Sequence, residues 1–193
     1  MTEASSIEST LAAAASELRS AGKQFALVGG LAVSVRAEVR FTRDVDVAVA
    51  VDDDREAEAL VLRLGSRGYR AIATVEHEIR HRLSTVRLLS PHGVKLDLLF
   101  ASSGLETEVV AHASPVLLPG VGELPVGEAE ELLAMKVLSM TERRLQDRID
   151  AQRLIACNPA LDLNRVRENL RLIRDRGFDR GEDLEAKLAS LLE

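Results

Sequence analysis

Residues 39–51, VRFTRDVDVAVAV, place two aspartates one residue apart at the start of an apolar run typical of a β-strand. Strand side chains alternate, so Asp44 and Asp46 are expected on one face and Val45 and Val47 on the other. A charge inside a sheet is costly unless something pairs with it. The pattern therefore indicates either a site for a divalent cation such as Mg²⁺, which prefers carboxylate oxygens, or an edge strand with one wet face.

A third aspartate follows on a second predicted strand. The segments 82–90, RLSTVRLLS, and 94–100, VKLDLLF, are joined by the turn 91–93, Pro-His-Gly, and predict a hairpin. Asp97 is expected on the face opposite Leu96. If this strand lies beside the Asp-x-Asp strand, three carboxylates converge, which is enough to hold two metal ions. The alternative is a salt bridge between Asp97 and an arginine of the facing strand.

The pair Gly29-Gly30 lies between a predicted strand at residues 24–28 and a predicted short helix at residues 31–39. Glycines at that point let the backbone approach an anion while the first N–H groups of the helix point at it. An ordinary helix cap explains the same letters. Neither a P-loop nor a G-x-G-x-x-G pattern occurs in the chain.

The remaining periodicities predict an α/β (α+β) fold in which a lobe with a mixed sheet, residues 1–125, precedes a helical lobe, residues 126–193. Residues 113–127 are rich in Pro, Gly and Val and predict short extended pieces or a linker. Further helices are expected at residues 6–21, 52–68, 128–140, 148–156, 163–177 and 182–192, and a further strand at residues 69–76.

Composition narrows the class of protein. The 193 residues are 46% apolar, which is typical of a globular chain, and the single cysteine excludes an intrachain disulfide. The polar, acidic first ten residues and the lack of a long apolar run predict a cytoplasmic protein without membrane contact. The net charge is −6, yet residues 134–180 carry an excess of Lys and Arg. That segment is either a solvated surface or a place to hold a polyanion beside the carboxylates.

The order of these features resembles the nucleotidyltransferase superfamily of the polymerase-β type, in which a glycine-containing turn grips the triphosphate and three carboxylates hold two Mg²⁺. Residues 27–49, LVGGLAVSVRAEVRFTRDVDVAV, are similar to the G-G…R-x-T-x-D-[IV]-D signature of AbiEii-type toxin nucleotidyltransferases, with Arg40 and Thr42 in register. Residues 131–154 supply a lysine and a D-x-x-D segment in the places where that branch has them. The Gly-Ser of the wider superfamily is Gly-Gly here, and Gln146 replaces the usual basic residue before the D-x-x-D segment.

The resemblance implies a role for each matching residue. The metal ligands would be Asp44, Asp46 and Asp97, and the catalytic set would add Lys136 and Asp147. The nucleotide-binding set would comprise Gly29, Gly30, Arg40, Thr42, Lys136 and Asp150. From the residues alone, Lys136 is equally an exposed helix lysine, and Asp147 and Asp150 are ordinary surface charges three apart. Arg40 and Thr42 either brace the Asp-x-Asp strand or touch the phosphates.

The implied activity is the transfer of a nucleoside monophosphate from an NTP to RNA, and it would depend on two Mg²⁺ ions. The expected acceptor is the 3′ end of a tRNA. Pyrophosphate would be released and translation would stop, so the chain would be the toxin of a toxin–antitoxin pair with a cognate antitoxin as partner. Two alternatives stay open: an aminoglycoside-like antibiotic as acceptor, or a nucleotidyltransferase-like antitoxin that acts by binding protein. The phosphate-binding surface would come from arginines 143, 144, 148, 153, 165, 167, 171 and 174.

Overall fold

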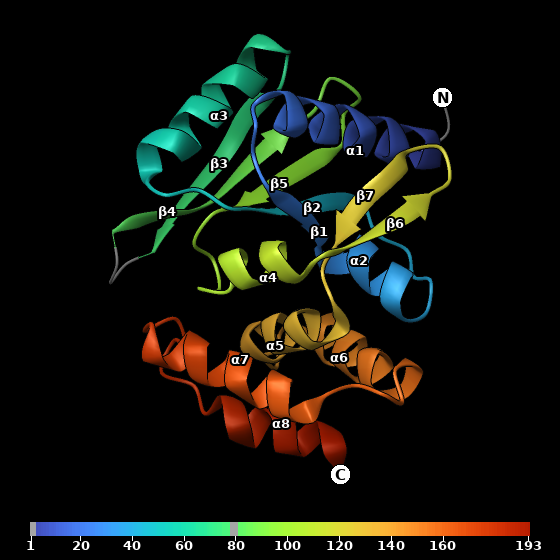
Figure 1. Ribbon diagram of the computed structural model, residues 1–193, viewed down its shortest axis with the longest axis vertical. Coiled ribbons are helices and arrows are strands. Elements are labelled where there is room, and N and C mark those ends of the chain that lie inside the picture. The colour runs from blue at the N-terminus through green and yellow to red at the C-terminus, as the bar shows by residue number, and fades with distance from the viewer. Residues whose placement is uncertain (1–2, 78–80) are drawn as a thin grey trace.

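The computed structural model describes residues 3–77 and 81–193. All of their strands, with four helices among them, lie in the first two thirds of the chain, and only helices follow (Figure 1). In order they are α1 (Glu3–Ser20), β1 (Phe25–Val28), α2 (Gly29–Arg36), β2 (Asp44–Val49), α3 (Asp54–Ser66), β3 (Arg70–His77), β4 (Arg82–Leu89), β5 (Lys95–Leu99), α4 (Glu106–His112), β6 (Ser114–Leu118), β7 (Gly122–Val126), α5 (Ala129–Ser139), α6 (Leu145–Cys157), α7 (Leu163–Asp175) and α8 (Leu184–Leu192). None of these described helices combines the length and the apolar character needed to cross a membrane.

The strands form one mixed sheet in the order β3-β4-β5-β2-β1-β7-β6. The centre of the sheet is β2, which pairs antiparallel with β1 and parallel with β5. The predicted hairpin of β4 and β5 is confirmed, with Val86 opposite Leu98. Because β2 and β5 are both central, their alternate valines and leucines are buried on one face, and the aspartates between them are held at fixed positions on the other.

Helices cover both faces of the sheet. Figure 1 shows α1 and α3 on one side and α2 and α4 on the other, with α5–α8 packed together beyond α2 and α4. The helix α1 repeats Leu11, Ala14, Ala15 and Leu18 at helical spacing, and all four are buried in the core. The aspartates of β2 therefore face the layer formed by the C-terminal helices.

Two parts of the fold go beyond the sequence-based expectations. Of the two alternatives for residues 113–127, short extended pieces are confirmed and a linker is wrong: β6 and β7 form a hairpin that joins the sheet, with β7 parallel to β1. Helix α4 was not predicted. The turn before it is stabilised by Glu106, whose carboxylate accepts hydrogen bonds from the backbone N–H groups of Ser102, Ser103 and Gly104. The division that we propose between residues 125 and 126 falls at the end of β7.

Candidate active site

The two central strands bring the acidic residues of the sheet together. In the parallel pairing of β2 with β5, Asp46 lies directly opposite Asp97, and Asp44 lies opposite Lys95. Asp97 is buried, whereas Asp44 and Asp46 are partly exposed. Desolvation, with the neighbouring charges of Asp97 and Asp44 adding to it, raises the pKa of Asp46 to about 6. This part of the sheet thus holds more negative charge than its surroundings neutralise.

An arginine on the facing strand binds the third carboxylate. Arg87 of β4 lies opposite Asp97 and donates to both of its oxygens, Nε to Oδ1 at 2.8 Å and Nη2 to Oδ2 at 2.6 Å. These hydrogen bonds to Asp97 raise the pKa of Arg87. The strand that carries Asp97 therefore does lie beside the Asp-x-Asp strand, as predicted, and Asp97 also forms the salt bridge that was the alternative to a metal site. Among residues 3–77 and 81–193, no three carboxylate, imidazole or thiol groups are arranged around one point as metal ligands.

The glycine pair forms the tight junction between β1 and α2. Gly29 has a φ of +63°, the left-handed region that favours glycine, and a Cβ there would overlap the carboxylate of Asp46. The backbone N–H of Gly30 donates to that carboxylate. A Cβ on Gly30 would in turn collide with the guanidinium of Arg40. Both glycines are thus required for charged side chains to pack directly against the backbone.

The lysine and the D-x-x-D segment of the C-terminal helices form a buried ionic cluster. Lys136 Nζ on α5 lies 2.7 Å from Asp147 Oδ1 and 2.7 Å from Asp150 Oδ2, both on α6. All three residues are buried, so Lys136 is not an exposed helix lysine and the two aspartates are not surface charges. Although burial opposes it, hydrogen bonds from Lys136 and Gln146 hold the pKa of Asp150 below its usual range.

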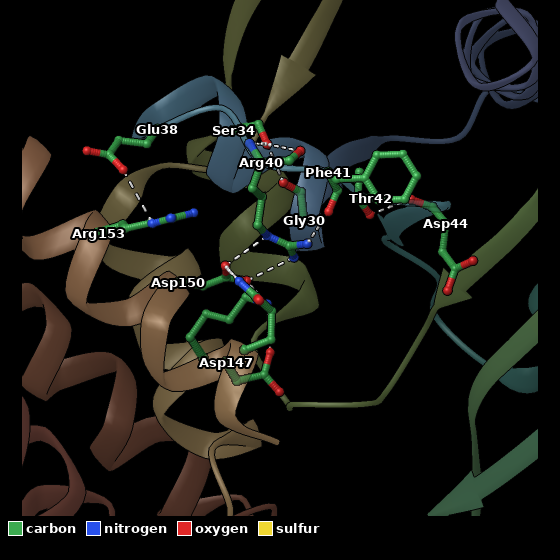
Figure 2. Close-up of polar contacts among 12 residues, drawn as sticks. Gly30, Ser34, Glu38, Arg40, Phe41, Thr42, Asp44, Asp147, Asp150 and Arg153 are labelled. Atoms are coloured by element: carbon green, nitrogen blue, oxygen red, sulfur yellow. Dashed lines mark hydrogen bonds and ion pairs between the residues drawn. The ribbon is translucent and has the colours of Figure 1, made fainter. Parts of the chain in front are cut away.

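Arg40 connects this cluster to the segment that precedes β2. Its Nε lies 2.8 Å from Asp150 Oδ1, and its Nη2 donates to Oδ2 at 2.9 Å, as Figure 2 shows. Thr42 Oγ1 donates to the backbone carbonyl of Asp44 at 3.4 Å. Both residues therefore lie in the segment that precedes β2, and the ion pair of Arg40 with Asp150 joins that segment to α6. A contact of either residue with phosphates stays a prediction.

A cleft of about 260 Å³ lies between the acidic sheet face and the C-terminal helices. Its walls include Gly29, Asp46 and Asp97 from the sheet side and Lys136 and Asp147 from the helices. Within the described part of the chain, five further polar residues line it that were not among the sequence-based candidates, namely Thr85, Arg87, Ser102, Ser139 and Arg180. The alternative of a salt bridge from Asp97 to an arginine of the facing strand gave a signal for Arg87, whereas no local pattern indicated Arg180.

Most of the arginines predicted to form a phosphate-binding surface have protein partners. Arg144 alone of that set lines the cleft, and its Nε lies 2.8 Å from Asp147 Oδ2. Several others pair with carboxylates outside the cleft: Arg153 with Glu38, Arg165 with Glu131, Arg167 with Glu185 and Arg174 with Asp175. Their positive charge is therefore partly neutralised within the chain.

Sequence comparison identifies a family for nearly the whole chain. A family model described as nucleotidyl transferase AbiEii toxin, Type IV TA system, matches residues 13–192. A comparison with curated protein sequences gave no match.

Solved structures with the same fold include an antigenic nucleotidyltransferase-like protein from Paracoccidioides brasiliensis, with a TM-score of 0.54 and 19% identity over 94% of this chain and 91% of that one. The solution structure of the antibiotic-resistance factor ANT(2'')-Ia has a TM-score of 0.51 and 16% identity over 86% of this chain and 91% of that one. A crystal structure of ANT(2'')-Ia in complex with adenylyl-2''-tobramycin has a TM-score of 0.50 and 14% identity over 91% and 99%. These likenesses establish the fold.

Proposed function

The chain belongs to the AbiEii family of nucleotidyltransferase toxins, and we propose that it transfers a nucleoside monophosphate from an NTP to RNA, with a tRNA 3′ end as the foremost acceptor. The observation that carries this proposal is the cross-strand pair Asp46 and Asp97, with Asp44 on the same face, beside a cleft whose opposite wall holds Lys136. The acceptor hydroxyl attacks the α-phosphorus and releases its proton to solvent, the bond between the α-phosphorus and the oxygen that bridges it to the β-phosphorus breaks, and pyrophosphate leaves.

The acidic face has the chemistry that a Mg²⁺ site requires. Its donors, Asp44, Asp46 and Asp97, offer only carboxylate oxygens. Burial, and after it the negative charge of Asp97, raises the pKa of Asp46, and a divalent cation would offset both effects. In this proposal these three residues would hold the metal, and Asp97 would have to give up its contact with Arg87 to do so. A bound Mg²⁺ supplies Lewis-acid stabilisation of phosphate charge and lowers the pKa of a bound hydroxyl.

The other residues of the cleft position the nucleotide. The N-terminus of α2 begins at Gly29, where backbone N–H groups and the helix dipole favour an anion. Lys136 is fixed in place by two carboxylates, so it presents a cation of defined position to the triphosphate. Rate enhancement of this kind rests on positioning and on charge neutralisation.

The test is a labelling reaction with each α-labelled NTP in turn, MgCl₂ and total tRNA. Wild type and Asp52→Asn, which changes an exposed aspartate outside the cleft, should label RNA, whereas Asp46→Asn should not. An unlabelled RNA fraction with the wild type would contradict the proposal. Label on an added aminoglycoside instead of RNA would support the antibiotic acceptor, although the Arg144 and Arg180 side chains on the cleft rim disfavour a cationic acceptor.

A growth assay tests the toxin role. Expression of the wild type should arrest growth, and expression of Asp46→Asn should not, because the arrest depends on transfer. Arrest by both forms would show an effect that does not need catalysis. Protection of cells from a neighbouring gene product by both forms would instead support a binding role as an antitoxin.

A further inference from the structure

Four cationic side chains line the cleft within the described residues: Arg87, Lys136, Arg144 and Arg180. Three of them have carboxylate partners, namely Asp97 for Arg87, Asp147 and Asp150 for Lys136, and Asp147 for Arg144. Arg180 differs from them. In residues 3–77 and 81–193, no carboxylate lies within ion-pairing distance of it, and its Nη2 donates only to the carbonyl of Ser102, at 3.4 Å. Its donors are therefore mostly available to a ligand.

The loop that carries Arg180 is anchored at two points to residues 104–108. It connects α7 to α8, and Arg176 at its start donates to both carboxylate oxygens of Glu108, at 2.8 and 2.6 Å. Phe178 is buried against Gly104, where a Cβ would overlap the phenyl ring. Because both anchors precede Arg180 within four residues, the loop holds Arg180 over the cleft at a fixed position.

The charges on this rim repel each other. Desolvation, followed by the charge of Arg144, lowers the pKa of Arg180. Arg144 uses its Nε for Asp147 and stays more than half exposed, so the rest of its guanidinium faces solvent. Two guanidinium groups that face one cleft from separate loops favour an anion with several oxygens, which accepts from both.

We propose that Arg180, with Arg144, forms a phosphate-binding subsite on the rim of the cleft. The inference rests on the proposed function, because the phosphate belongs either to the triphosphate of the nucleotide or to the backbone of the RNA acceptor. The phosphate contacts the rim while the acidic face opposite it, around Asp46 and Asp97, stays free for the reacting groups. Arg180 is thus a binding residue of the site.

The experiment measures binding without turnover. Isothermal titration calorimetry follows inorganic tripolyphosphate, and fluorescence anisotropy follows a fluorescein-labelled single-stranded RNA, both in MgCl₂. The variants are Arg180→Gln, Arg180→Lys and, as a matched control, Arg55→Gln, which removes an exposed arginine of α3 remote from the cleft. Thermal unfolding of each variant verifies that it folds, which we expect because Arg180 makes a single long hydrogen bond to the described part of the chain.

We expect Arg180→Gln to weaken binding about tenfold, the loss of one charge-assisted hydrogen bond, with Arg180→Lys intermediate and Arg55→Gln like wild type. Weaker binding of tripolyphosphate, whether or not RNA binding also weakens, assigns the subsite to the nucleotide triphosphate. Weaker binding of RNA alone, with the slope of log K against log salt reduced by about 1, assigns it to the acceptor backbone. Either result supports the subsite, and unchanged affinity for both probes overturns it.

The failure of this inference is distinguishable from the failure of the proposed function. A wild type that binds a probe through Arg180 but labels no RNA overturns the proposed function and leaves the subsite intact. A wild type that labels RNA, while Arg180→Gln binds both probes with wild-type affinity, overturns the subsite alone.

Discussion

Arg87 binds both carboxylate oxygens of Asp97, its direct cross-strand neighbour, at 2.8 and 2.6 Å. The acid that is expected to complete the metal site is thus already neutralised by the protein. Because a cation and Arg87 compete for the same two oxygens, the ion pair sets how readily the acidic face accepts a divalent ion.

The first prediction follows from this competition. Arg87→Gln should tighten the binding of Mg²⁺ or Mn²⁺ about tenfold, because the metal no longer displaces a charge-assisted hydrogen bond. The apparent affinity is measured from the rise in unfolding temperature during a metal titration. The control is Arg82→Gln. It changes another arginine of β4, removes the ion pair of that arginine with Asp54 of α3, and should leave the metal affinity unchanged. Weaker metal binding by Arg87→Gln would mean that Arg87 orders Asp97 for the metal rather than competing with it.

The second prediction concerns the charge of Asp46. Its pKa is about 6 in the fold against an ordinary value of 3.8, so between these pH values the folded protein binds more protons than the unfolded chain. The free energy of unfolding therefore falls as pH rises through this window. In EDTA, Asp46→Asn should be more stable than wild type by up to about 3 kcal/mol at pH 8, and the difference should disappear near pH 4. Asp52→Asn, measured beside it by urea unfolding, should show no such pH-dependent gain.

Strand alternation predicted which way the acidic side chains face, but not which strands pair. It placed Asp44 and Asp46 on one side of β2 and Asp97 on one side of β5, and the Pro-His-Gly turn made β4 and β5 neighbours. The pairing of β5 with β2 was conditional in the sequence, because nothing local specifies which strands lie side by side when a helix and a hairpin separate them. The family resemblance supplied that step, and the sheet confirms it.

Contacts between distant segments explain what the sequence did not reveal. Lys136 has the same helical context whether it is exposed or buried, and its burial depends on two aspartates of another helix. Arg180 reaches the cleft only because Phe178 and Arg176 anchor their loop to the segment around Gly104. Such placements depend on tertiary packing, which residue spacing does not encode.

The third prediction compares two ion pairs that link the segment before β2 to α6. Asp150 is fully buried between Arg40 and Lys136. Asp150→Asn therefore removes the charge that faces the buried Lys136 and the partly buried Arg40, and it should cost about 3 kcal/mol in the free energy of unfolding. Glu38 pairs with Arg153 at 3.4 Å and its side chain is 64% exposed. Glu38→Gln should therefore stay within about 1 kcal/mol of wild type. Equal costs, measured by urea unfolding, would contradict the importance of burial.

The fourth prediction separates the two demands on Gly29. Both Gly29 and Gly22 have φ near +65°, at +63° and +68°, but a Cβ on Gly22 meets nothing within 4 Å, whereas one on Gly29 overlaps the Asp46 carboxylate. Gly22→Ala should therefore lower the free energy of unfolding by only about 1 kcal/mol, the cost of a left-handed backbone for a residue with a Cβ, and should retain nucleotide transfer. Gly29→Ala should cost more and should abolish transfer, because Asp46 has to move. Labelling and thermal unfolding of the two variants measure this difference. Transfer by Gly29→Ala at the rate of Gly22→Ala would show that the close contact of Gly29 with Asp46 is not needed for the reaction.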